Sequence, residues 1–106
     1  MDRQTILSGG LKLLSTEALP SLISAARLFP TPPDAAVMAL VTIRSAGITV
    51  SFKEGTDPTA SAVGNDYAAA NTPYEFWMNA QEMAKVKAIQ QAATTTGYIS
   101  YFGVVG

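Results

Sequence analysis

Hydrophobic and polar residues alternate most clearly in residues 48–52 (ITVSF), where every second side chain is apolar. This period of two predicts a half-buried antiparallel strand. The preceding residues 36–44 (AVMALVTIR) are apolar on both faces, which predicts a central strand. Gly47 lies between these segments and can adopt the positive φ of a tight turn. The pattern therefore predicts a β-hairpin made of these two strands.

Shorter strand patterns lie on both sides of this predicted hairpin. Residues 73–78 (PYEFWM) and 98–102 (YISYF) are rich in aromatic residues, which favour strands. Upstream, residues 11–14 and 22–29 suit two short strands better than a helix, because Pro20 would interrupt a helix there. The chain thus offers strand candidates along most of its length.

Residues 80–92 (AQEMAKVKAIQQA) carry conflicting signals. Helix-forming residues fill this stretch, and Met83, Val86 and Ile89 fall near helical spacing. The local pattern alone therefore predicts a helix in a chain that otherwise favours strands.

Several short strands separated by turns are typical of an antiparallel β-sandwich or a small jelly roll, here with about seven or eight strands. We expect one all-β domain with two parts. Residues 1–34 would be an N-terminal arm or the first strands, ending in a proline-rich connector (PTPP), and residues 35–106 would form the sandwich core. The predicted core residues are Val41, Ile43, Val50, Phe52, Phe76, Ile89 and Ile99.

The chain is short of charge for its length. Charged residues make up 14% of its 106 residues and hydrophobic residues 48%, and seven basic and eight acidic residues give a net charge of −1. Average globular domains carry about 25% charged residues. We therefore expect further copies of the chain or other partners to cover part of its surface. The basic residues are scattered, which argues against nucleic acid as a partner, and no apolar run is long enough to predict a membrane span.

The available residue types limit the chemistry. The sequence has no cysteine and no histidine, which excludes thiolate catalysis, cysteine zinc sites and histidine bases. Glu75 and Glu82 could form a glycosidase-like pair, but Glu75 falls on the polar face of a strand. Glu54, Asp57 and Asp66 could ligate calcium, yet their spacing matches no EF-hand and Asp57 precedes a proline as a turn residue does. We predict no enzyme, no cofactor and no metal.

Aromatic residues leave one further candidate. Trp77 and the tyrosines near it could form a platform on which sugars stack. At two-residue spacing, such rings more often fill a sandwich core or a subunit interface. Trp77 is therefore a candidate partner-binding residue under either interpretation.

Two runs of the chain are informative as units: AAVMALVTIRSAGITVSFKEGTDPTASAVGNDYAAANTPYEFWM and MAKVKAIQQAATTTGYISYFG. The first combines an apolar strand, a tight turn, a strand with alternating polar residues, a loop and an aromatic strand. The loop EGTDPTASAVG follows a "DGT.PT...G" pattern with Glu54 where Asp is usual, and the second run ends in a "..SYYG"-like strand. Together, over residues 35–103, they resemble a group of small structural proteins of tailed bacteriophages and prophages.

The resemblance implies a small β-sandwich in the virion, of the capsid decoration (cement) or neck/tail type. It implies a non-enzymatic protein that stabilises the head by binding between major capsid subunits, as a homo-oligomer with a trimer favoured. Residues 86–91 would then form a strand, and the loop at residues 54–67 would cross from one sheet to the other. Four residues would serve the geometry of that loop: Gly55, Thr56, Pro58 and Gly64. The alternative function is a carbohydrate- or receptor-binding module of a phage head or tail fibre.

The N-terminal residues 1–14 lie outside the resemblance and are unusually apolar. Ile6, Leu7, Leu11 and Leu13 surround the flexible pair Gly9-Gly10. Such a segment suits an arm that becomes ordered against a partner. An ordinary edge strand of the sandwich explains the same residues equally well, so both interpretations stay open.

Overall fold

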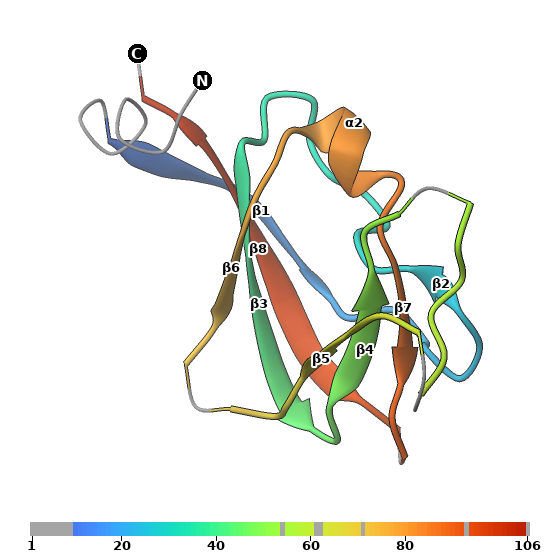
Figure 1. Ribbon diagram of the computed structural model, residues 1–106. Coiled ribbons are helices and arrows are strands. Elements are labelled where there is room, and N and C mark those ends of the chain that lie inside the picture. The colour runs from blue at the N-terminus through green and yellow to red at the C-terminus, as the bar shows by residue number, and fades with distance from the viewer. Residues whose placement is uncertain (1–9, 54, 61–62, 71, 93, 106) are drawn as a thin grey trace.

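The computed structural model describes residues 10–53, 55–60, 63–70, 72–92 and 94–105. The chain forms two four-stranded antiparallel sheets that pack face to face (Figure 1). The strands are β1 (Leu11–Ala18), β2 (Ala26–Arg27), β3 (Met38–Ser45), β4 (Ile48–Ser51), β5 (Asn65–Tyr67), β6 (Tyr74–Trp77), β7 (Lys87–Gln90) and β8 (Thr96–Val104), and a short helix, α2 (Ala80–Met83), precedes β7. We call β1-β8-β3-β6 the first sheet and β2-β7-β4-β5 the second sheet.

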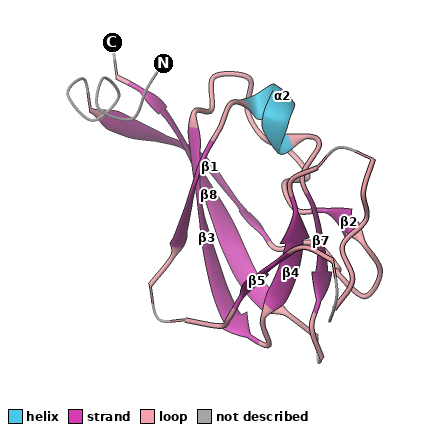
Figure 2. Cartoon of the chain, in the orientation of Figure 1, coloured by secondary structure: helices cyan, strands magenta, loops and turns pink. Residues whose placement is uncertain are grey.

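The strand pairing is nested. β1 pairs with β8, β2 with β7, β3 with β6 and β4 with β5, as in one long hairpin folded at the β4–β5 loop. This hairpin is rolled up so that β8 also pairs with β3, and β7 with β4. Rolling a long hairpin in this way produces the eight-stranded jelly roll. The predicted all-β sandwich is therefore confirmed, and Figure 2 shows how little helix it contains.

The predicted hairpin of β3 and β4 is wrong, because these strands lie in different sheets. The chain crosses between the sheets at residues 46–47. Ala46, not Gly47, takes the positive φ there, at 43°. Gly47 serves a close approach instead, since a Cβ atom on it would lie 2.7 Å from the carbonyl oxygen of Tyr67.

The position of the long loop also differs from the expectation. Residues 52–64 connect β4 to β5, which are neighbours within the second sheet, so this loop does not cross between sheets. The crossing comes later, between Tyr67 at the end of β5 and Tyr74 at the start of β6. β4 is buried on both faces and not half-buried as its alternation predicts, because Thr49 and Ser51 are only 2% and 4% exposed.

The helix and strand signals in residues 80–92 are both partly correct. α2 is a single turn that begins at the N-cap Asn79, whose side chain accepts a hydrogen bond from the backbone N–H of Glu82, while the Glu82 carboxylate accepts from the N–H of Asn79. Such reciprocal capping stabilises a helix start. From Lys87 the chain is a strand, paired on both sides, as the resemblance implies.

The hydrophobic core lies between the sheets. Five of the predicted core residues are buried there: Val41, Ile43, Val50, Phe76 and Ile99. The prediction is wrong for Phe52, which follows the end of β4 and is 41% exposed, although its ring lies 6.0 Å from that of Phe76. It is also wrong for Ile89, which is half-buried on the other side of β7 from the fully buried Ala88.

Residues 10–34 contribute directly to this core. β1 and β2 each form one edge of a sheet, and Leu28 and Phe29 are fully buried. The ring of Phe29 lies 5.6 Å from that of Phe76 and 6.2 Å from that of Tyr101, in edge-on geometries that favour aromatic pairs. The described part of the N-terminal third is thus a set of strands and a core-filling connector.

Candidate interaction surface

One row of apolar side chains crosses the outer face of the first sheet. Leu13 on β1 is the cross-strand partner of Phe102 on β8, Phe102 is the partner of Met38 on β3, and Met38 is the partner of Trp77 on β6. Directly opposite residues in antiparallel strands point to the same side of the sheet. Because their neighbours Ala39 and Tyr101 point into the core, this row points outward. We call these four residues the outer row.

The outer row is partly exposed and continues toward the ends of β1 and β8. Leu13 is 58% exposed, Phe102 and Trp77 are half-buried, and Met38 between them is only 5% exposed. The next cross-strand pair, Leu11 and Val104, is also half-buried and extends beyond the end of β3 as a two-stranded ribbon. Figure 1 shows this ribbon projecting from the body of the molecule. Three of the five residues that the sequence suggests for partner binding, Leu11, Leu13 and Trp77, therefore share one face, whereas Ile6 and Leu7 lie outside the described residues.

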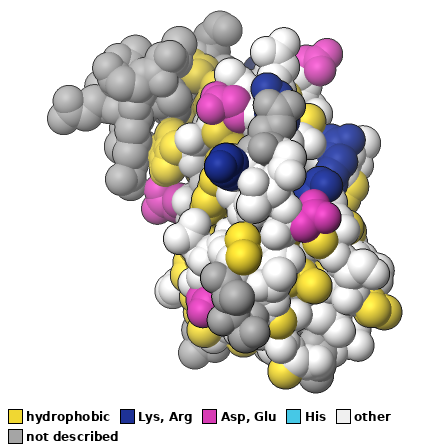
Figure 3. Space-filling model, turned by 45° about the vertical axis from the view of Figure 1, so that its right-hand side comes forward, with side chains coloured by type: hydrophobic (Ala, Val, Ile, Leu, Met, Phe, Trp, Pro, Cys, Tyr) yellow, Lys and Arg dark blue, Asp and Glu magenta, His cyan; other side chains and the backbone are white. Residues whose placement is uncertain are grey.

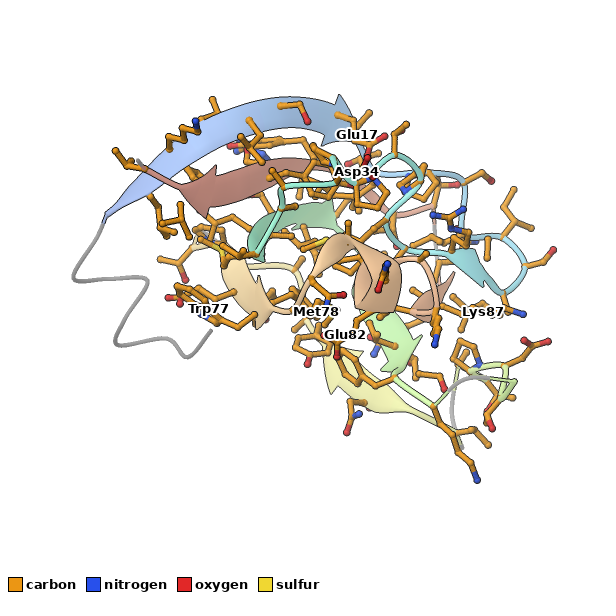
Figure 4. The ribbon with its side chains drawn as sticks, turned by 90° about the horizontal axis from the view of Figure 1, so that it is seen from above. Glu17, Asp34, Trp77, Met78, Glu82 and Lys87 are labelled. Atoms are coloured by element: carbon orange, nitrogen blue, oxygen red, sulfur yellow. The ribbon has the colours of Figure 1, made fainter. Side chains whose placement is uncertain are left out.

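Trp77 is held in place by a neighbour on its own strand. Its indole N–H donates a 2.7 Å hydrogen bond to Oε1 of Glu75, which also lies on the outer side of β6. Figure 4 shows Trp77 beside β6, on the opposite side of the molecule from Lys87. The polar edge of the indole is thus satisfied by the chain itself.

The tyrosines do not gather around Trp77. Tyr101 is fully buried between the sheets, and Tyr74 packs edge-on against Tyr67 at 5.0 Å. Tyr98 is 39% exposed on the outer face, but it lies near the other end of β8, where the guanidinium of Arg44 is 5.4 Å from its ring centroid. The tyrosines therefore do not form a sugar-stacking platform with Trp77, whereas the ring of Phe102 lies on the same face.

The four predicted loop residues lie in the β4–β5 connection. Gly55 and Gly64 have positive φ values of 80° and 121°. Thr56 donates its backbone N–H to the carbonyl oxygen of Lys53 at 3.1 Å, and Pro58 is buried. A Cβ atom on Gly64 would lie 2.8 Å from both Cγ2 of Thr49 and the carbonyl oxygen of Val50, so the loop lies tightly against β4 there.

The described carboxylates that suggested catalysis or calcium binding have structural partners, whereas Glu54 lies outside the described residues. Asp57 forms a 2.8 Å ion pair with Lys87, Asp66 accepts from the hydroxyl of Thr49 at 2.9 Å, and Glu82 caps α2. Within residues 10–53 and the other described ranges, no three acidic side chains come together as a metal site. Figure 3 shows acidic and basic side chains interspersed on the face that it presents, without a large area of one sign.

A polar cluster joins the first sheet to the proline-rich connector. The carboxylate of Glu17 accepts from the backbone N–H of Thr31 (3.1 Å), from its hydroxyl (2.8 Å) and from the buried hydroxyl of Tyr101. Burial and the Glu17 carboxylate raise the pKa of Tyr101 well above its ordinary value. The phenol therefore stays protonated and acts as a structural donor.

A shallow open hollow of about 330 Å³ lies beside this cluster, between the proline-rich connector and α2. Arg27, Thr31, Asp34 and Gln81 supply its polar groups. The hollow is small and wide open compared with ligand pockets, which bury most of their ligand. Its shape does not favour a small-molecule site.

Comparison with known proteins gives no relative from which to assign this surface: no family model, no curated protein and no solved structure matches the chain. Among the described residues, no helix is long and apolar enough to cross a membrane. Sequence reasoning missed Met38 and Phe102 as members of the outer row. Their outward direction was readable from the alternation of β3 and β8, but their alignment with Leu13 and Trp77 depends on the register of three strand pairs.

Proposed function

We propose that this chain is a non-enzymatic structural protein of a bacteriophage virion, which stabilises the head by binding between major capsid subunits. The outer row carries the proposal. All four strands of the first sheet contribute to this apolar row, in which Leu13 is most exposed and Met38 is buried, and apolar residues of this kind fill the centres of protein interfaces.

Two further features support this function. Jelly rolls occur in viral capsid proteins, although a fold by itself does not assign a function. The sparse charge of the chain agrees with a surface that is covered in an assembly. The identity of the partner as a capsid subunit follows from the sequence resemblance over residues 35–103.

The alternative, a carbohydrate- or receptor-binding module, is less well supported. Jelly rolls also occur in lectins. However, the indole N–H of Trp77 already donates to Glu75, and Tyr74 and Tyr101 point away from the outer face. On the outer face a sugar would meet the half-buried rings of Trp77 and Phe102, which are separated by Met38, and Tyr98 lies near the other end of β8.

The test uses phage particles induced from a bacterial strain that naturally encodes the chain. The gene for the chain is first deleted from that strain. The wild-type chain, supplied from a plasmid, should band with the particles in caesium chloride at a fixed ratio to the major capsid protein. Leu13→Asp should lower that ratio about tenfold, because it places a charge in the outer row, which the capsid partner would bury. Ile23→Asp is the matched control, since Ile23 is 69% exposed and lies outside the outer row.

Two results would contradict the proposal: absence of the wild-type chain from the particles, and equal losses for Leu13→Asp and Ile23→Asp. Quenching of Trp77 fluorescence by a glycan, without retention on particles, would instead favour the carbohydrate-binding alternative.

A further inference from the structure

β1 is the longest edge strand that the structure describes. Within the described ranges it pairs with β8 alone, through seven of its eight residues, whereas the other edge strands β6, β2 and β5 have four, two and three residues. Natural proteins keep edge strands short or protect them, because their unpaired N–H and C=O groups can pair with another strand. The edge of β1 therefore requires an explanation.

Three backbone hydrogen bonds show which residues of β1 point their N–H and C=O groups toward this edge. The N–H of Leu19 donates to the carbonyl oxygen of Gly97, and the N–H of Val105 donates to that of Gly10. The carbonyl oxygen of Phe102 accepts from Val37 on the other side of β8. Odd-numbered residues of β8 thus bond to β1 and even-numbered residues bond toward β3.

The partners of the odd-numbered residues Gly103, Tyr101 and Ile99 are Lys12, Ser15 and Glu17, so these three residues of β1 bond inward to β8. Apart from Leu14, which lies in the bulge, the remaining residues point their backbone groups outward to the edge: Leu11, Leu13, Thr16 and Ala18. The change of phase between Leu13 and Thr16 comes from the bulge between Leu13 and Ser15.

One symmetric register satisfies all of these groups. If two copies of β1 pair antiparallel about a two-fold axis between Leu14 and Ser15, Leu13 lies opposite Thr16 of the second copy, and Leu11 lies opposite its Ala18. Every edge-facing residue then meets another edge-facing residue, as the hydrogen-bonded pairs of an antiparallel ladder require. This register also uses the full eight residues of β1.

The same register is complementary in charge. Lys12 lies opposite Glu17 of the second copy, twice per dimer. Both residues pair with core-side residues of β8, Gly103 and Ile99, so their side chains point to the same face of the sheet. Glu17 accepts three hydrogen bonds from Thr31 and Tyr101, and a carboxylate can accept about four. One acceptor site is left for the ammonium of Lys12.

We propose that two copies of this chain associate through their β1 strands, so that the two first sheets join into one eight-stranded sheet. The outer rows of the two copies then lie on one continuous face, with Leu13 of each copy beside Thr16 of the other. The bulge and Lys12 restrict the edge to this register, because a shift by two residues removes the Lys12–Glu17 contacts and shortens the ladder. The interface is isologous and closes at two copies, in contrast to the trimer that the resemblance implies.

Sedimentation velocity of the purified chain tests this association without reference to its role in a virion. A monomer–dimer equilibrium is expected for the wild type. Lys12→Glu places a carboxylate opposite the like-charged Glu17 in both of the symmetric contacts and should weaken the dimer about tenfold. Lys53→Glu makes the same change in net charge at an exposed position in the second-sheet loop and should leave the dimer unchanged. A monomer at all concentrations, or a trimer, would overturn the proposal.

Amide hydrogen exchange locates the interface independently. The amides of Leu13, Thr16 and Ala18 should be protected in concentrated wild-type protein and should exchange faster on dilution or in Lys12→Glu. Those of Lys12 and Glu17 bond to β8 and should stay protected in both states. A dimer whose dilution leaves the edge-facing amides unchanged uses another surface and contradicts the proposed pairing.

Discussion

The two sheets of this jelly roll differ in how far the rest of the described chain covers their outer faces. The first sheet has long strands and leaves Leu13 and the ring of Trp77 partly open on its outer face. The second sheet has strands of two to four residues, yet Thr49 on its outer face is 2% exposed. Within the described ranges, the chain covers the outer face of the second sheet with its own loop more fully than that of the first sheet.

The β4–β5 loop closes the second sheet. Pro58 is buried, Gly64 lies against Thr49, and Asp57 reaches Lys87 on β7. This ion pair also offsets the like charges of Lys87 and Arg27, which are direct cross-strand partners. The turn-rich composition of the loop therefore serves to cover a sheet, which is why it needs little apolar surface of its own.

The largest effect is expected where both sheets depend on one side chain. Phe29→Ala should lower the free energy of unfolding by about 4 kcal/mol, because it leaves a cavity among the rings of Phe76 and Tyr101. Urea unfolding followed by Trp77 fluorescence and by far-ultraviolet circular dichroism should show one shared transition. A loss below about 1 kcal/mol, or separate transitions for the two probes, would show that the sheets do not share this core.

A smaller loss is expected when the cover of the second sheet is disturbed. Gly64→Ala should cost about 2 kcal/mol, because φ is positive there and the new Cβ would meet the backbone of Val50 at 2.8 Å. Gly55→Ala is the control. It has φ at 80° but open space around it, so its cost should be about 1 kcal/mol. Equal losses in thermal or urea unfolding would mean that the loop does not press on the sheet.

The next comparison is alkaline sensitivity. Burial, with the Glu17 carboxylate, raises the pKa of Tyr101 in the first sheet, and burial, with Tyr74, raises that of Tyr67 in the second. A raised pKa means that the folded state keeps its proton after the unfolded chain, with a pKa of about 10, has lost it. The contribution of each tyrosine to the free energy of unfolding is therefore fully present below pH 10. Above pH 10 it declines by up to about 1.4 kcal/mol per pH unit for each group.

Urea unfolding between pH 8 and 11 measures this slope. Tyr101→Phe should remove more of the alkaline decline than Tyr67→Phe does. Tyr101→Phe should also cost about 1 kcal/mol at pH 7, because the hydrogen bond to Glu17 is lost. An unchanged slope in Tyr101→Phe would show that this phenol ionises normally in the folded state.

The smallest effect is expected on the open face. Leu13→Ser should change the free energy of unfolding by less than about 0.5 kcal/mol in dilute solution, because this side chain is already 58% exposed. Thr49→Ala on the closed face should cost about 1 kcal/mol, since Thr49 donates to Asp66. A larger loss for Leu13→Ser than for Thr49→Ala, measured below the concentration of any dimer, would reverse the assignment of open and closed faces.

Local patterns were sufficient to predict the strand content but not the partners of each strand. The alternation in residues 48–52 placed Val50 in the core correctly, and it suggested the wrong neighbour because the two residues between β3 and β4 are enough for a hairpin. Alternation states which face of a strand is buried and carries no information about which sheet the strand joins. That choice depends on β6, β7 and β8, which come much later in the chain.

The residues of the candidate surface could be predicted only in part, because the sequence pattern does not give the register between strands. Leu11, Leu13 and Trp77 stood out as apolar or aromatic residues, but their common face required the register of β1, β8, β3 and β6. Phe52 and Ile89 failed as core residues because each prediction assumed a strand boundary or phase that the sequence does not mark. One residue of phase error moves a side chain from one face to the other.

The place of β8 between β1 and β3 has a consequence for how the protein is made. During synthesis, β1 is made about 80 residues before β8, which is its strand partner within the described ranges and joins it to the rest of the first sheet. Nearly all strand pairs link distant parts of the chain, so folding must close long loops before contacts compensate for the lost entropy. We expect slow folding that begins after translation of β8, with the free edge and the apolar residues of β1 exposed to the cell in the meantime.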